Sequence, residues 1–81
     1  METIEENVIS TVASNLRVPS NSITLQSPLT DLGADELDLV RIIVDLEDRY
    51  AISLTDEDVE KVETVGDIAR LIQEACAPKD K

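Results

Sequence analysis

The chain has 81 residues, of which 42% are hydrophobic and 31% are charged, so its composition is that of one small folded domain and not of a disordered tail. It contains no His and one Cys, which excludes Cys/His zinc sites, Ser-His or Cys-His nucleophile pairs and any internal disulfide. A cysteine without a partner favours a reducing compartment, and we therefore expect the protein in the cytoplasm.

The net charge is strongly negative. Eighteen acidic residues oppose seven basic ones, which gives −11 at neutral pH. Such a surface repels phosphate backbones and anionic lipids, so we expect neither nucleic acid nor membrane as a partner. It attracts basic protein surfaces, although a strong negative charge is also explained by solubility alone. We expect a monomer that meets basic protein partners.

The first expected element is a helix over residues 3–16. Thr3 and Glu6 have the spacing of a capping box, in which each side chain accepts a hydrogen bond from the backbone N–H of the other residue. Pro19 follows closely and prevents the helix from continuing. The apolar positions recur every three or four residues: Ile4, Val8, Ile9, Val12, Ala13 and Leu16.

Residues 17–35 are expected to form a connection rich in Pro, Ser and Asn, which ends near Gly33. A connection of this length is uncommon in a compact domain unless it is pinned or functional. We expect four apolar side chains to pin it beneath the helices: Ile23, Leu25, Leu29 and Leu32.

A second helix is expected to begin at Asp35 or Glu36 and to end near Tyr50. Asp35 is a favourable N-cap residue, and Asp38 adds a negative charge to the first turn, where the helix dipole favours it. Its core-facing positions share one broad side of the helix: Leu39, Ile42, Ile43, Leu46 and Tyr50.

Two further helices complete the predicted fold. Thr55 caps a short helix that ends near Lys61, and Thr64 precedes a last helix with an apolar stripe of its own. The pattern predicts a small all-α bundle of three main helices and one short one, with the long connection between the first two. We expect a single domain over residues 1–76 and a flexible C-terminal tail over 77–81.

The second helix also carries a narrower apolar stripe, formed by Leu37, Val40 and Val44. A small bundle can bury one stripe of a surface helix but rarely has enough chain to bury two. An exposed apolar patch surrounded by acids is typical of a docking surface. The alternative is that the connection 17–35 folds over this stripe and hides it.

The start of the second helix resembles a known family. Residues 31–38 read Asp-Leu-Gly-Ala-Asp-Glu-Leu-Asp and are similar to the acyl carrier protein motif Asp-Leu-Gly-Ala-Asp-Ser-Leu-Asp. The likeness extends from residue 3 to about residue 73. It implies a four-helix bundle of fatty-acid or specialised acyl metabolism that carries acyl chains on a phosphopantetheine arm. It further implies that the second helix binds basic surfaces of synthases, reductases and dehydratases.

The resemblance and the second apolar stripe together predict the partner-binding residues. The resemblance matches Asp35, Asp38, Glu47 and Asp48 to acidic positions and Val44 to an apolar contact, and the stripe adds Leu37 and Val40. Arg41 completes the set. Arg41 stands where the family usually has an acid, and Arg49 adds another base, so the set of partners is expected to be narrower or different. These departures favour a naturally divergent member over an introduced change.

Glu36 is the most important departure, because it occupies the position at which the family attaches phosphopantetheine to Ser. A phosphopantetheinyl transferase needs a hydroxyl oxygen to attack the pyrophosphate of coenzyme A. By sequence spacing, Ser27 and Thr30 come too early to replace it, and Ser53 comes too late. We therefore expect no cofactor on this chain, and phosphopantetheine only if position 36 were Ser. As an acid in the first turn, Glu36 also suits the helix dipole.

We expect no catalytic residues, because a chain this small has too little core for a dry pocket of paired carboxylates. Cys76 is either a packed apolar side chain or an exposed thiol, and no base in the sequence marks it as activated. The acidic cluster of residues 56–60 lacks the spacing of a calcium loop, so we expect a solvated helix start and no metal site. Two functions stay open: a carrier-family module that docks on acyl-processing enzymes, and a regulatory protein that uses the carrier fold without carrying anything.

Overall fold

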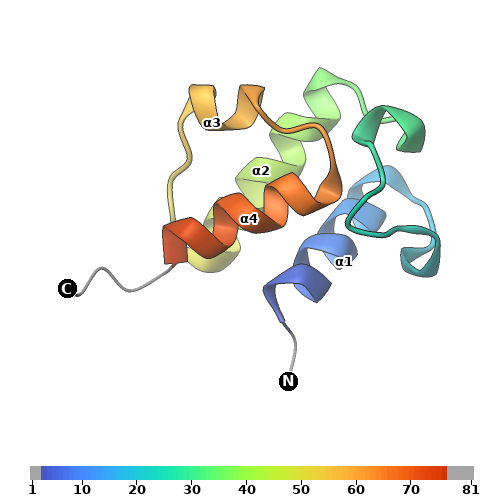
Figure 1. The fold of residues 1–81 in the computed structure, drawn as a ribbon, viewed down its shortest axis with the longest axis horizontal. Coiled ribbons are helices and arrows are strands. Elements are labelled where there is room, and N and C mark those ends of the chain that lie inside the picture. The colour runs from blue at the N-terminus through green and yellow to red at the C-terminus, as the bar shows by residue number, and fades with distance from the viewer. Residues whose placement is uncertain (1–2, 77–81) are drawn as a thin grey trace.

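The protein is described by a computed structural model that covers residues 3–76. Its four α-helices are α1 (Ile4–Leu16), α2 (Glu36–Tyr50), α3 (Asp56–Glu60) and α4 (Val65–Cys76). Three long helices and one short one confirm the predicted all-α fold, and Figure 1 shows their arrangement. The expected tail, 77–81, lies outside the described residues. None of the described helices is both long and apolar enough to span a bilayer.

The helix starts are fixed by side-chain caps that the sequence predicts. At α1, Thr3 and Glu6 form a complete capping box, with each side chain 3.1 Å from the backbone N of the other residue. At α2, the Asp35 carboxylate accepts from the Asp38 N–H at 2.9 Å, and the Asp38 carboxylate accepts from the Asp35 N–H at 3.2 Å. Because Asp35 is the cap, Glu36 is the first residue of α2.

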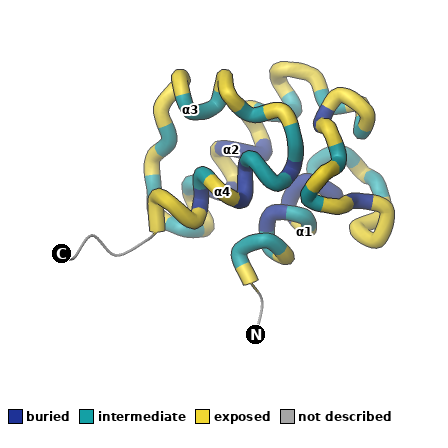
Figure 2. The backbone as a smooth tube through the Cα atoms, in the orientation of Figure 1, coloured by how far each residue is buried: buried dark blue, intermediate teal, exposed yellow. Residues whose placement is uncertain are grey.

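The core lies between α1, α2 and α4, which pack against one another. Figure 2 shows the buried positions of these helices facing the centre, whereas α3 has none. The largest side chains with no exposed surface are aliphatic, as expected for a chain with one aromatic residue. They are Val8, Val12, Ile42, Leu46, Val65, Ile68 and Ile72.

The connection between α1 and α2 is more regular than the sequence suggests, since it contains two 3₁₀ turns, η1 (Ser20–Ser22) and η2 (Leu29–Leu32). Of the expected pins, Ile23 and Leu29 are buried, while Leu25 and Leu32 are partly buried against the core. In Figure 1 the connection lies beside the start of α4. Three backbone hydrogen bonds join them: Leu29 N to Glu63 O (2.9 Å), Val65 N to Ser27 O (3.1 Å) and Gly66 N to Leu25 O (2.8 Å).

We call this contact between the connection and the start of α4 the junction. Asp67 stabilises the α4 side of the junction. Its carboxylate accepts from the backbone N–H groups of Glu63 at 2.9 Å and Thr64 at 3.1 Å, and the Thr64 hydroxyl accepts from the Asp67 N–H at 3.2 Å. These hydrogen bonds, with the Glu63 N–H contributing most, lower the pKa of Asp67 below its ordinary value of 3.8. The charged carboxylate is therefore the form that stabilises the junction.

Asp67→Asn is expected to make folding less sensitive to acid. A lowered native pKa means that Asp67 stabilises the fold above its unfolded pKa, and that this contribution is lost as the pH falls through the native pKa. The wild type should therefore be more stable than the variant at pH 7, and the difference should shrink below about pH 4. Urea denaturation of both proteins between pH 7 and pH 3 measures it. If the difference in stability between the two proteins stayed constant over this pH range, the pKa of Asp67 would not be lowered in the folded protein.

Candidate functional site

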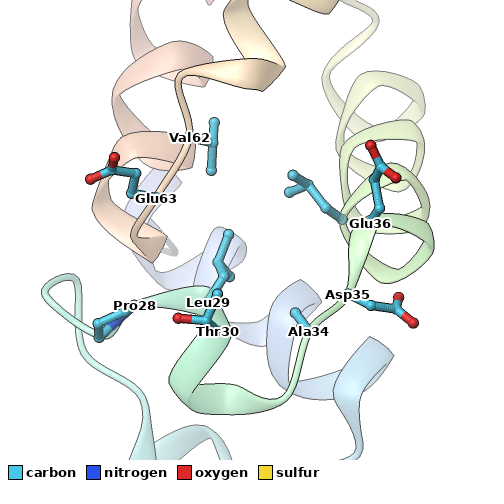
Figure 3. Close-up of a pocket in the computed structure, with 9 residues that line it drawn as sticks. Pro28, Leu29, Thr30, Ala34, Asp35, Glu36, Val62 and Glu63 are labelled. Atoms are coloured by element: carbon cyan, nitrogen blue, oxygen red, sulfur yellow. The ribbon is translucent and has the colours of Figure 1, made fainter.

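The first turn of α2 borders an open cavity of about 610 Å³. Figure 3 shows the cavity between the start of α2, the turn η2 and the segment that precedes α4. Its lining combines apolar side chains with acids at the edge: Pro28, Leu29, Thr30, Ala34, Asp35, Glu36, Leu39, Val62 and Glu63. No basic residue belongs to this set, so the entrance is electrostatically negative.

Glu36 and Asp35 play different parts at this entrance. Asp35 is occupied as the cap of α2, and the hydrogen bond from the Asp38 N–H is the main cause that lowers the Asp35 pKa below 3.8. Glu36 is exposed and extends along α2, while the Asp35 carboxylate points in another direction (Figure 3). Position 36 therefore offers an accessible carboxylate beside an apolar cavity.

The chemistry at position 36 does not fit the covalent attachment of phosphopantetheine, because a carboxylate lacks the hydroxyl oxygen that forms the phosphodiester. Among the residues that line the cavity, Thr30 has the only hydroxyl. The sequence spacing set Thr30 aside, yet the fold places this exposed residue on the same cavity as Glu36. Figure 3 shows it on the η2 side. Only the bend of the connection, which sequence spacing does not reveal, brings the two residues together.

The second apolar stripe of α2 is exposed, as predicted. Leu37 exposes 69% of its surface, and Val40 and Val44 each expose 49%. On the opposite side of the helix, Ile42 and Leu46 are completely buried. The alternative that the connection 17–35 covers this stripe is wrong. We call Leu37, Val40 and Val44 the apolar strip.

The four acids expected around the apolar strip differ in whether their carboxylates form hydrogen bonds with the backbone. Asp35 and Asp38 form the capping box of α2, and Asp48 is exposed. Glu47 is half-buried, and its carboxylate accepts from the Leu54 N–H at 2.7 Å. Glu47 therefore also holds the turn between α2 and α3, a structural role that the sequence pattern did not reveal.

Helix α3 lies next to the apolar strip, although no pattern in the sequence indicated this. Two hollows of about 420 Å³ and 160 Å³ lie between α2 and α3, and Val40, Asp56 and Val59 line both of them. The other lining residues are apolar or acidic: Glu36, Leu39, Ile43, Val44, Glu47, Leu54, Glu60 and Val62. The strip is thus bordered on the α3 side by a groove with acidic edges.

The remaining candidates lie outside the two hollows. Arg41 and Arg49 are exposed on α2 and line neither hollow. Cys76 is an exposed free thiol at the end of α4. Within residues 3–76, no three His, Cys, Asp or Glu side chains gather into a possible metal site. Asp58 of the acidic cluster instead completes the capping box of α3 with Thr55.

Comparison with known families agrees with this geometry. The chain matches the family described as phosphopantetheine attachment site over residues 6–72, a range that contains α2, α3, the cavity and most of α1 and α4. Domains of this family normally carry phosphopantetheine, and the family includes carrier proteins of the acyl carrier type. The small all-α fold is the one that the resemblance to acyl carrier proteins implied. The chain therefore belongs to the phosphopantetheine attachment site family.

Proposed function

We propose that this protein is a carrier-type module that docks on basic surfaces of acyl-processing enzymes through α2 and exists without the phosphopantetheine arm. Its setting is fatty-acid or specialised acyl metabolism in the cytoplasm. It acts as a monomer and is not itself an enzyme. The eight residues proposed to contact partners are Asp35, Leu37, Asp38, Val40, Arg41, Val44, Glu47 and Asp48.

One observation carries the docking proposal: three apolar side chains of one helix are exposed, and two of them, Val40 and Val44, line hollows whose charged residues are all acidic. Exposed apolar side chains bring affinity when a partner covers them, and surrounding acids select partners that present Lys and Arg. The net charge of −11 extends the attraction beyond contact distance and accelerates encounters.

The proposal that the arm is absent rests on Glu36. The residue stands at the start of α2, beside the cavity. The acyl carrier protein motif that residues 31–38 resemble has Ser at this position. Transfer of the arm to a carboxylate would give a mixed anhydride, which water hydrolyses, and not a stable phosphodiester. Glu36 also favours a regulatory role in which the module occupies a partner enzyme without delivering an acyl chain, and this is the second candidate function.

Val44→Asp is expected to weaken docking at least about tenfold, because it places a charge within the apolar strip. The probe is a broad-specificity phosphopantetheinyl transferase, whose Kd for the purified chain is measured by calorimetry without coenzyme A. Val44 is half exposed, so helicity and Tm should stay nearly the same.

Ser14→Asp is the matched control, since it adds the same charge at an exposed position of α1. This variant should bind the transferase like the wild type. If Val44→Asp unfolds the protein, the strip belongs to the core, and if it leaves the Kd unchanged, α2 is not the docking surface. A wild type that does not bind the transferase at all would also contradict the proposal.

A further inference from the structure

Arg41 lies directly beside the apolar strip, on the side away from Val40. On α2, residues three and four positions apart are neighbours on the surface, so Arg41 is a neighbour of both Leu37 and Val44. All three are exposed. A partner that covers Leu37 and Val44 therefore also meets the Arg41 side chain beside them.

The two acids closest to Arg41 along the helix already accept hydrogen bonds from other groups. Asp38 and Asp45 stand three residues before it and four residues after it, at the spacing of helical ion pairs. The Asp38 carboxylate accepts from the backbone of Asp35 at 3.2 Å, and the Asp45 carboxylate accepts from the Asn15 amide at 3.5 Å. Each carboxylate thus accepts a hydrogen bond from a donor other than Arg41, and the Arg41 side chain is exposed to solvent.

The two sides of the apolar strip consequently differ in charge. The α3 side has Glu36, Glu47, Asp56 and Glu60 around the two hollows and no base among their lining residues. On the opposite side, Arg41 interrupts the acids of α2. A uniformly cationic partner surface suits the first side but repels Arg41 on the second. Close contact between like charges at an interface suppresses unsuitable partners.

We propose that Arg41 is a specificity-determining residue: it disfavours partners with a uniformly cationic docking face and favours a partner that places an acidic side chain beside the strip. The cognate partner then has Lys or Arg toward α3 and Asp or Glu opposite Arg41. This inference rests on the proposed docking function of α2 and adds the charge pattern of the partner.

The test compares Arg41→Glu with Arg49→Glu, using the same transferase as a cationic probe. Both substitutions change the net charge equally and affect exposed residues of α2, but Arg49 is a surface neighbour of neither Leu37 nor Val44, since it stands twelve and five residues from them. We expect Arg41→Glu to lower the Kd about fivefold or more at low salt, and Arg49→Glu by less than about twofold. The increase in affinity caused by Arg41→Glu should become smaller as the ionic strength rises.

A second set of measurements locates the contact. Lys and Arg residues on the docking face of the transferase are changed to Glu one at a time and tested against the wild type and the R41E variant. One reversal should tighten binding to the wild type and weaken binding to R41E, which is the coupling expected for charges in contact.

The outcomes separate this inference from the proposed function. If Val44→Asp weakens binding while Arg41→Glu and Arg49→Glu have equal effects, only net charge matters and Arg41 has no specific role. An Arg41→Glu variant that binds no more tightly, or more weakly, than the wild type also overturns the inference. If Val44→Asp leaves the Kd unchanged, the proposed docking function fails.

Discussion

Glu36→Ser should convert the chain into a substrate of a broad-specificity phosphopantetheinyl transferase. The new hydroxyl stands on the first residue of α2, next to the open cavity. Its oxygen would attack the phosphorus that carries the pantetheine group, a phosphodiester would form, and adenosine bisphosphate would leave as the pyrophosphate bond breaks. With coenzyme A and transferase, intact-mass spectrometry should show the gain of one phosphopantetheine on the variant and none on the wild type.

Two controls make this result specific. Glu36→Ala removes the carboxylate without supplying a hydroxyl, so it should gain no mass. Thr30→Val, combined with Glu36→Ser, removes the one hydroxyl among the cavity-lining residues, and this double variant should still gain one arm. A mass gain on the wild type would refute the arm-less proposal, and its loss in Thr30→Val alone would place the attachment at Thr30.

The boundaries of the helices could be predicted because they depend on local signals. Thr3, Asp35 and Thr55 are good N-caps, and each has an acid three residues later that completes a capping box. The exposure of Leu37, Val40 and Val44 could also be predicted, since a single helix presents two apolar stripes and only one faces the core. These conclusions need no knowledge of how distant segments meet.

The remaining features depend on such distant contacts and could not be predicted. Thr30 shares a cavity with Glu36 because η2 turns the connection back toward α2. Val59 lines the hollows beside the apolar strip because the turn after α2 places α3 next to that helix. Glu47 looked like a free acid, but its backbone partner, Leu54, is seven residues away. A hydrogen bond from a backbone N–H to a side chain seven residues away leaves no pattern in the sequence that would reveal it.

Gly66→Ala should destabilise the protein, although Ala is normally the better residue in a helix. A Cβ atom at position 66 would lie 2.8 Å from the carbonyl oxygen of Leu25, which also accepts the Gly66 N–H at 2.8 Å. The Leu25 carbonyl belongs to the backbone, and the new Cβ atom is attached directly to the backbone of residue 66. Neither can rotate away, so the clash is relieved only if the connection and α4 move apart. Overpacking of this kind costs about 1–3 kcal/mol, against roughly 1 kcal/mol gained from helix propensity.

The measurement is the Tm by circular dichroism, with a fall of roughly 5 to 15 °C expected for a domain of this size. Hydrogen exchange at the amides of Leu29 and Val65 should also accelerate, because their bonds belong to the same junction.

Gly33→Ala supplies the comparison that isolates the close approach of the two segments. A Cβ atom at position 33 would meet no atom within 4 Å, but the φ angle of +82° is one that side chains rarely adopt. This variant should lose about 1 kcal/mol through backbone strain while the amides of Leu29 and Val65 stay protected. Faster exchange in both variants would mean that the junction opens with any loss of stability. Faster exchange in Gly66→Ala alone would show that the connection can pack against α4 only because residue 66 has no side chain. The same packing positions the η2 side of the cavity.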